Sequence, residues 1–367
     1  MPSASDRVRD LIQASGLSQR DFALRIGLDD SKLSKSLGGT RRFSSLDLAR
    51  IAELCEVTVD WLITGEEPPL ALAARTTGGS AGAAIKAAKR YSTLRSDITA
   101  LGYPQPWRTP TARINGGTWA AQGEQLAKAA SAEVTQAGRT LDEADLPKLI
   151  EHVFGADVAV AELGADFDGL AVSSPEVKLI VLSTSHVPAR QRFTLAHELA
   201  HLIADDDQGV HLDRDVYDKV QSRDPTEQRA NAFAAAFLMP AERLTRAVDT
   251  GGFGETDFAA LACELAVSPS ALAIRLLKLR LIDAGTCDRF KAVSAAKAAT
   301  LAGRGEELSR RTAAAAIPRA PGLLVRDTYA AYEAGRSTLR PYAALIDVEV
   351  EDLRDALESG SEVHGGK

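Results

Sequence analysis

The amino-acid sequence predicts a multidomain protein that is mainly α-helical and contains one α+β core. With 367 residues, the chain is long for a single hydrophobic core and suggests roughly two or three domains. Residues 5–65 consist of short amphipathic segments separated by glycines and helix-capping residues. Three short β-type segments between residues 158 and 182 precede a helical pattern over 192–204, as expected where strands pack against helices.

The composition is that of an ordinary soluble globular protein. Hydrophobic residues make up 45% of the chain and charged residues 25%, with a net charge of −7. This balance argues against a protein that coats nucleic acid regardless of sequence, but it leaves room for a small DNA-reading module. The three cysteines are far apart, and no segment has the pattern of a signal peptide or a membrane span. We therefore expect a cytoplasmic protein without a membrane partner.

The first domain, residues 1–66, is expected to contain five short helices. The second helix is predicted over 19–26 and the third over 32–37, where Asp30 or Ser31 would begin it. A tight, glycine-containing turn joins these two helices. Two helices joined in this way inside a helical packet are typical of a helix-turn-helix.

Residues 5–65 resemble the lambda-repressor-type, or Xre-family, DNA-binding domain, including the ending Val-Asp-Trp-Leu-Ile-Thr-Gly at 59–65. The resemblance implies that the third helix lies in the major groove of operator DNA. The side chains that would then face base edges or phosphates are Ser31, Lys32, Ser34 and Lys35. The side chains that would hold the DNA backbone are Gln19, Arg41 and Arg42.

The charge of this domain is balanced, because basic and acidic residues are equally numerous between residues 5 and 65. Basic residues clustered on one edge of a neutral domain favour site-specific over bulk DNA binding. Asp29 and Asp30 stand at the head of the third helix, where they would repel phosphate. A role in protein contacts alone, such as homodimer formation, is therefore an alternative.

Residues 67–118 are predicted to be a linker that contains one helix. Pro68 and Pro69 end the preceding helix, and the Gly-, Ala- and Thr-rich stretch 73–84 is typical of a flexible joint. A helix is expected over 85–101, and a proline-rich irregular stretch follows it.

Residues 119–250 are expected to form the α+β core. The helices predicted at its start cover 122–134 and 146–154. The predicted strands cover 158–163, 169–173 and 177–182. The acidic stretch 205–213, which follows the helical pattern over 192–204, is expected to be a polar loop.

The motif His197-Glu198-Leu199-Ala200-His201 is the most informative feature of this core. Residues i and i+4 share one face of a helix, so both imidazoles can bind one metal ion beside Glu198. The same motif also occurs by chance on helices with two surface histidines, so a third ligand is needed. Glu227, at the start of a predicted helix, is the best candidate, and Asn231 one turn later could hold a ligand imidazole.

Other histidines are less well placed for a metal site. His211 lies in the expected polar loop, and His152 and His186 lie upstream of the motif. The donor that would stabilise an oxyanion is not identified by the sequence, where Tyr217 and His211 are only guesses. The metal site therefore depends on the pair of segments around 197–201 and 227–231.

These two segments, Phe193-Thr-Leu-Ala-His-Glu-Leu-Ala-His201 and Ala230-Asn-Ala-Phe-Ala-Ala-Ala-Phe-Leu-Met-Pro240, resemble the ImmA/IrrE family of bacterial metallopeptidases. The resemblance covers roughly residues 119–282 and implies a zincin-like fold. One position departs from the family pattern: Arg229 stands where a second acid is often found.

The resemblance also implies a role for each residue of the site. His197, His201 and Glu227 would bind a Zn2+ ion, and Glu198 would act as the general base in amide hydrolysis. A degenerate peptidase that binds zinc without cleaving is the alternative. The sequence does not separate these two outcomes.

The remaining residues are predicted to be helical. Residues 251–290 would form a helix-turn-helix-like segment around the Val-Ser-Pro-Ser turn at 267–270, which either contacts nucleic acid or packs on the peptidase. Residues 291–367 are expected to be a C-terminal helical region with a disordered tail from Ser359.

Two functions follow from these resemblances. Relatives of the ImmA/IrrE family cleave Xre-type repressors, which implies a regulatory zinc endopeptidase acting on a transcriptional repressor in a stress or mobile-element response. The alternative is a DNA-binding transcriptional regulator, or the antitoxin of a toxin–antitoxin pair, whose peptidase domain senses or binds a partner such as the cognate toxin. The sequence supports both functions.

Overall fold

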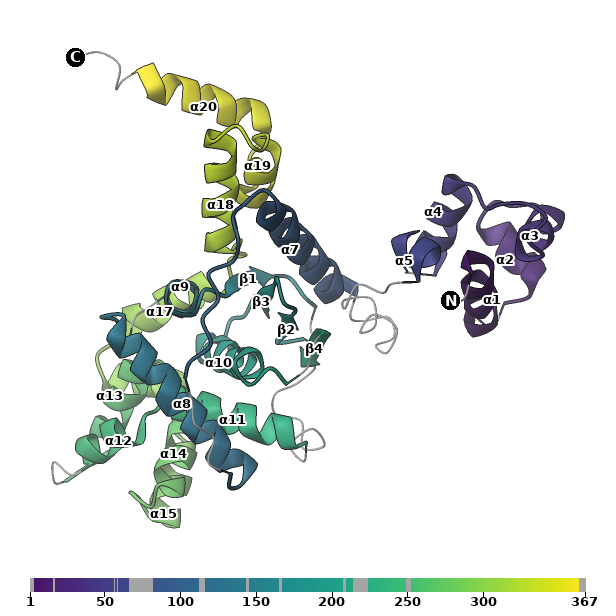
Figure 1. The fold of residues 1–367 in the computed structure, drawn as a ribbon. Coiled ribbons are helices and arrows are strands. Elements are labelled where there is room, and N and C mark those ends of the chain that lie inside the picture. Colours follow the sequence, from purple (N-terminus) through teal and green to yellow (C-terminus); the bar gives the residue numbers. More distant parts are fainter. Residues whose placement is uncertain are drawn as a thin grey trace. The chain divides into compact units, whose positions relative to one another are not determined.

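The computed structural model describes residues 3–15, 17–55, 57, 59–65, 82–111, 116–142, 145–164, 167–206, 209–213, 224–248 and 252–362. The chain folds into two compact units, Met1–Gly79 and Ser80–Lys367 (Figure 1). Most of the joint expected over 73–84 lies outside the described residues, which resume at Gly82.

The first unit has its own hydrophobic core. Its described helices are α1 (Ala4–Ser15), α2 (Gln19–Arg25), α3 (Asp30–Leu37), α4 (Ser45–Leu54) and α5 (Val59–Thr64). Phe22, Leu33 and Ile51 are fully buried between them. The Arg7 guanidinium donates to the Leu62 carbonyl oxygen from Nε at 3.1 Å and from Nη2 at 2.9 Å. These bonds join α1 to α5 and close the unit.

Helix α3 begins two residues earlier than the sequence predicted. Asp29, rather than Asp30 or Ser31, is the N-cap, because its carboxylate accepts a hydrogen bond of 2.8 Å from the Ser31 amide. Hydrogen bonds from Ser31 hold the pKa of Asp29 below its usual value. An acidic N-cap satisfies a free amide and complements the helix dipole. The acid at the head of α3 therefore has a structural role of its own.

The second unit is built around a four-stranded sheet. Its strands are β1 (Asp157–Ala161), β2 (Gly169–Ser173), β3 (Lys178–Ser183) and β4 (Gly209–Asp213), in the order β1-β3-β2-β4. β1 is parallel to β3, while β2 is antiparallel to both β3 and β4. A small sheet in a mostly helical unit is consistent with the predicted α+β core.

Strand β4 corrects the expectation of a polar loop over 205–213. Val210 pairs with Val172, and Leu212 pairs with Leu170, so residues 209–213 form an edge strand on β2. The alternation Gly-Val-His-Leu-Asp over 209–213 is a period-two pattern. The strand was not predicted because the pattern is short and the acidic residues before it are typical of a loop.

Helices cover both faces of the sheet. α10 (Pro188–Ala204) packs against β2 and β3 on one face, and α7 (Gly82–Ala100) packs against the same strands from the other (Figure 1). α9 (Leu146–Phe154) and α18 (Gly322–Glu333) contact β1. α11 (Pro225–Leu238) lies against α10, and α8 (Trp119–Gln136) lies against α11. The strands thus fix the position of α10, and α10 and α8 fix that of α11.

Gly123 allows the close approach of α8 and α11. A Cβ atom at this position would lie 2.3 Å from the Arg229 carbonyl oxygen and 2.9 Å from the Phe233 amide nitrogen. Both neighbours are backbone atoms, so only a shift of one whole helix could make room for a side chain. The glycine therefore sets the position of α11 beside α10.

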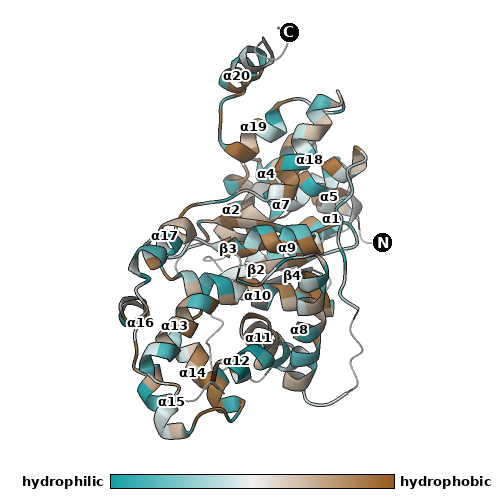
Figure 2. Cartoon of the chain, turned by 90° about the vertical axis from the view of Figure 1, so that its left-hand side faces the viewer, coloured by the Kyte–Doolittle hydropathy of each residue, from teal (hydrophilic) through white to brown (hydrophobic). Residues whose placement is uncertain are grey.

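The remaining described helices follow α11 in the chain. They are α12 (Ala241–Val248), α13 (Glu255–Leu265), α14 (Pro269–Lys278), α15 (Ala284–Lys291), α16 (Ala295–Leu301), α17 (Gly305–Ala315), α19 (Arg340–Ile346) and α20 (Val350–Glu362). Residues 359–362 form the last turn of α20, which corrects the tail expected from Ser359, while residues 363–367 lie outside the described part. These helices carry both hydrophilic and hydrophobic residues (Figure 2), as amphipathic helices do.

A buried ion network joins distant parts of the second unit. Arg95 of α7 is fully buried and binds Asp157 of β1 through Nε at 2.7 Å and Nη2 at 2.9 Å. Its Nη1 atom also donates to Asp327 of α18 at 2.8 Å. These bonds connect α7 and α18 to the sheet. Removing one partner would leave a buried charge uncompensated, so the network is costly to break.

No single described helix combines the length and the hydropathy of a membrane span. The pair α13 and α14 meets those criteria only when both helices are counted together, and it is bent by 107°.

Candidate metal centre

Helix α10 carries the His197–His201 motif in a fully enclosed position. Pro188 occupies its first turn, and Asp205 ends it in the left-handed conformation with φ 51°. Every residue from Thr194 to Ile203 is buried, including both histidines and Glu198. Burying this many polar groups on one apolar helix is unfavourable unless each has a partner.

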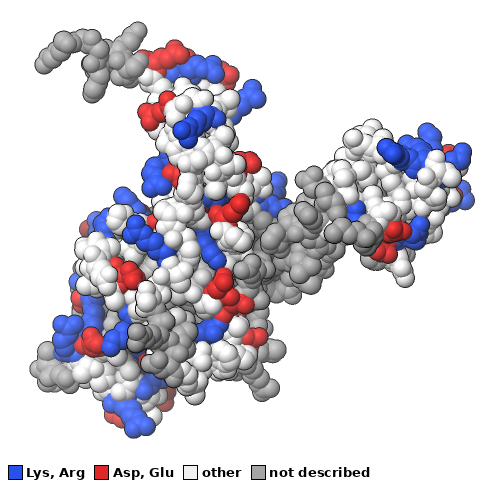
Figure 3. Space-filling view, in the orientation of Figure 1, with Lys and Arg blue, Asp and Glu red and all other residues white. Residues whose placement is uncertain are grey.

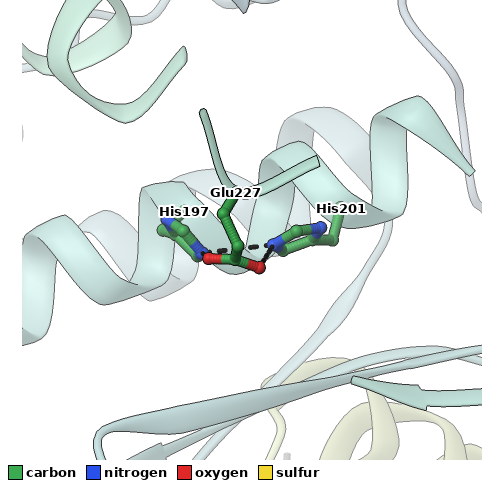
Figure 4. A group of neighbouring side chains, drawn as sticks. All are labelled: His197, His201 and Glu227. Atoms are coloured by element: carbon green, nitrogen blue, oxygen red, sulfur yellow. Dashed lines mark hydrogen bonds and ion pairs between the residues drawn. The ribbon is translucent and has the colours of Figure 1, made fainter. Parts of the chain in front are cut away.

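Glu227 of α11 reaches the two histidines of α10 (Figure 4). The Nε2 atoms of His197 and His201 are 3.1 Å apart. Glu227 places Oε2 at 3.2 Å from the His197 Nε2 atom and Oε1 at 3.4 Å from that of His201. The three side chains are 0%, 4% and 5% exposed. The structure therefore brings together the three residues that the sequence proposed as metal ligands.

A second contact on each imidazole fixes its orientation. The Nδ1 atom of His197 lies 3.2 Å from Oδ1 of Asn231, and the Nδ1 atom of His201 lies 3.2 Å from Oδ2 of Asp206. Both partners are acceptors, so in neutral imidazoles the proton is on Nδ1 and the Nε2 lone pairs face each other. Two such lone pairs and the Glu227 carboxylate then converge on one point, which is the arrangement that a metal cation binds.

The spacing of these atoms fits a metal ion. A tetrahedral zinc site with bonds of about 2.0–2.1 Å places its ligand atoms about 3.3 Å apart. The observed separations of 3.1, 3.2 and 3.4 Å are close to that value. All three groups offer a ligand atom within 4.8 Å of one another. Two nitrogens and one oxygen would leave a fourth position open, as in catalytic rather than structural zinc sites.

Asp206 is a site residue that sequence reasoning missed. It lies just beyond the end of α10, in the acidic stretch that was expected to be only a polar loop. The signal that could have found it is its position five residues after His201, because a carboxylate near a ligand histidine often holds its second nitrogen. Asn231 occupies the place that its spacing from Glu227 predicted.

Arg229 explains the departure from the family pattern. Its guanidinium forms an ion pair with Asp206 and lies over the Trp119 ring, 5.3 Å from the centroid. Arg229 is 9% exposed, and burial lowers the pKa of its guanidinium. In place of a second acid, the chain thus has a base that holds the carboxylate contacting His201.

Of the other candidate residues, the structure describes the side chains of two histidines, and neither belongs to the group of His197, His201 and Glu227. His152 and His186 are exposed. Tyr217 and the side chain of His211 lie outside the described residues. Glu198 is fully buried three residues before His201, on the same side of α10.

Most of the residues proposed to bind DNA are exposed, whereas two of them bind acidic side chains of their own unit. Ser31, Lys32, Ser34, Lys35 and Arg42 are exposed. Lys and Arg gather at the α3 end of this unit on the face shown in Figure 3. Gln19 instead donates to Asp30 at 3.1 Å, and Arg41 pairs with Asp47 at 2.8 Å. The exposed set lies along α3 and the loop after it.

Comparison with known proteins agrees with the geometry of the second unit. Residues 154–277 match the sequence profile of the Peptidase_M78 family, described as an IrrE N-terminal-like domain. The chain is 38% identical over 115 residues to the radiation response metalloprotease IrrE of Deinococcus radiodurans. It is 43% identical over 83 residues to the protein of the same name from Deinococcus deserti. These findings support an ImmA/IrrE-type metallopeptidase domain in this part of the chain.

The similarity covers only part of each protein. The two alignments include 29% and 21% of this chain, and 33% and 29% of the two relatives. A solved structure of Bacillus thuringiensis PlcR in complex with the peptide PapR7 and DNA aligns with 98% of this chain and 94% of its own, at 10% identity. Its TM-score is 0.16, which is too low to indicate a shared fold.

Proposed function

We propose that this chain is a regulatory zinc-dependent endopeptidase of the HExxH-plus-Glu type, fused to an Xre-type DNA-binding domain. The observation that carries the proposal is the convergence of His197, His201 and Glu227 in a buried group with Glu198 beside them. Zinc is the metal that suits this set of two imidazoles and one carboxylate with an open position. The names of the relatives, radiation response metalloproteases, support a regulatory rather than a degradative role.

The residues of the site divide the chemistry among them. His197, His201 and Glu227 would hold a zinc ion, which would supply Lewis-acid activation of water and of the peptide carbonyl. Glu198 accepts the proton of the attacking water and delivers it to the leaving amine. Asn231 and Asp206 keep the two imidazoles in the tautomer and orientation that ligation needs.

The proposed substrate is a transcriptional repressor of the Xre type, cleaved in a stress or mobile-element response. Support comes from the N-terminal unit, because the exposed side chains of α3 are suited to DNA binding. We propose that they bind the operator that the repressor also binds. Enzyme and repressor would then meet on the same DNA.

The test combines metal content with proteolysis by the full chain. The purified protein should contain one zinc per chain and cleave an Xre-type repressor encoded beside it. Glu198→Gln should keep the zinc and reduce the cleavage rate by about 10²–10⁴, the usual contribution of a general base. Absence of stoichiometric zinc, or cleavage unaffected by Glu198→Gln, would reject the peptidase.

The second candidate function is a DNA-binding transcriptional regulator, or an antitoxin whose peptidase domain binds the cognate toxin. The exposed row of Ser31, Lys32, Ser34 and Lys35 on α3 favours it. Joint replacement Lys32→Ala and Lys35→Ala should abolish binding of the full chain to its own promoter. The matched control, Lys86→Ala with Lys128→Ala, removes two exposed charges from the other unit and should leave binding unchanged. Equal binding by both double variants would remove α3 from the DNA interface.

A further inference from the structure

A cavity with mainly apolar walls lies beside the start of α10. It is bounded by residues 186–189, the turn between α13 and α14, helix α16 and helix α17, and it has a volume of about 300 Å³. We call it the alanine cavity, because alanines of α13 and α16 form much of its wall. Its described lining includes none of the metal-centre side chains.

Small side chains keep this cavity open. Ala262 of α13 and Ala298 and Ala299 of α16 are buried where these two helices pack against each other. Val267 and Pro269 of the turn after α13 continue the apolar wall. Packed helices normally leave few voids larger than a water molecule. A hollow of about 300 Å³ between α13, α16 and α17 is therefore a candidate ligand site.

The charged side chains in the wall bind one another. Glu307 pairs with Arg311, and its Oε2 atom lies 3.3 Å from Nη1 of Arg304. Nη1 of Arg311 also donates to the Cys263 carbonyl oxygen at 2.8 Å. Because both guanidinium groups already have an acceptor within the protein, a ligand does not need to bring a charge of its own.

The thiol of Cys263 indicates how polar the interior of the cavity is. Cys263 lies in the wall and is half-buried. Burial raises the pKa of this thiol above its usual value, although the charges of Arg304 and Arg311 act in the opposite direction. Desolvation thus outweighs two nearby cations, as expected where the surroundings are mainly apolar.

We propose that the alanine cavity binds a small, uncharged and mainly apolar molecule, about as large as a two-ring aromatic compound. An apolar cavity of about 150 Å³ is large enough to bind benzene. The alanine cavity has about twice that volume and lies at the lower end of the range of small-molecule sites. Its concave shape favours a small molecule over the flat surface of a protein partner.

The position of the cavity places this ligand against the helix that carries the proposed metal ligands. Pro188 and Ala189, in the first turn of α10, form part of the wall, and α17 packs against α10. A molecule in the cavity therefore contacts the helix on which His197 and His201 lie. This contact does not depend on whether the metal centre is a peptidase.

Calorimetric titration of the full chain with indole tests the site. Indole has two fused rings and no charge, and we expect saturable binding of one molecule per chain. Indole-3-carboxylate has the same rings with a negative charge, and it should bind no more tightly than indole, because its carboxylate would be desolvated. Failure of indole to bind, or tighter binding of the carboxylate, would overturn the proposal.

A larger side chain in the wall should block the cavity. Ala296→Phe replaces an exposed alanine of the lining and should weaken indole binding by at least about tenfold. The matched control is Ala292→Phe, which adds the same ring at an exposed position outside the lining and should leave the affinity unchanged. Equal affinities of the two variants would place indole elsewhere.

The Cys263 thiol gives a second measurement, which needs no variant. Saturating indole should slow the alkylation of Cys263 by N-ethylmaleimide, as followed by peptide mass, because a ligand in the cavity covers the thiol. Cys55, in the other unit, is the internal reference and should react at the same rate with and without indole. If bound indole leaves the rate at Cys263 unchanged, the alanine cavity is not its site.

Discussion

The metal centre and the exposed side of α3 hold their polar groups in opposite ways. At the candidate metal centre, His197 and His201 are buried, and each contacts a second residue, Asn231 or Asp206. Along α3, Lys32 and Lys35 are exposed, and the helix determines only the direction in which they leave the surface. The difference shows that contacts within the protein fix the side-chain positions of a buried centre before any ligand binds. On an exposed surface, the side chains take up fixed positions only when a partner binds.

The largest effect is expected at the buried centre, from replacement of the proposed third ligand, Glu227. Glu227→Ala removes the carboxylate between the two imidazoles, so zinc affinity should fall by more than the roughly 10–100-fold that loss of an outer contact costs. A chelator should lower the melting temperature of the wild-type chain but not that of the variant, since bound zinc stabilises only the folded state. Stoichiometric zinc in Glu227→Ala would exclude this residue as a ligand.

Loss of an outer contact should have a smaller effect on the same centre. Arg229→Ala releases Asp206 from its ion pair, and we expect zinc affinity to fall by about 10–100-fold in competition with a chelator. Arg246→Ala, which removes a surface arginine of α12, is the control and should bind zinc normally. If both variants bind zinc as tightly as the wild type, Arg229 has no role in holding His201.

The packing behind the centre can be tested by one added methyl group. Gly123→Ala would force α8 and α11 apart and should reduce the free energy of unfolding by about 1–3 kcal/mol. Gly305→Ala, where no atom lies within 4 Å of the added Cβ, should change it by no more than about 0.5 kcal/mol. Chemical denaturation of both variants measures the difference, and equal stabilities would show that α8 does not constrain α11.

The smallest effect is expected on the exposed side. Lys35→Ala alone should weaken DNA binding only about tenfold or less and reduce the salt dependence by about one counterion. Its melting temperature should equal that of the wild type, because Lys35 is exposed. A lower melting temperature of this variant would show that Lys35 contributes to the stability of the fold, and would contradict its assignment to a surface that acts only through its partner.

Local patterns in the sequence predicted much of this fold. The helix over 146–154 and the strand over 169–173 have the predicted bounds, since a capping acid and a glycine turn mark them locally. The grouping of His197, His201 and Glu227 was also predicted, because helical spacing places the two histidines on one face and Glu227 begins the other helix of the motif pair. These features depend on neighbours a few residues away.

The features that the sequence did not predict depend on distant contacts. β4 becomes a strand because β2 offers it a partner, and Asp206 becomes part of the centre because Arg229 and His201 meet it there. No pattern within one segment contains that information.

Helix α11 has a consequence for how the metal centre is assembled. One helix supplies the ligand Glu227, the amide of Asn231 that fixes His197, and the guanidinium of Arg229 that holds the partner of His201. Since successive residues of an α-helix are about 100° apart, turning α11 by one residue would withdraw all three at once. The three contacts of the centre therefore depend on one helix, and any change in the register of α11 would remove them together.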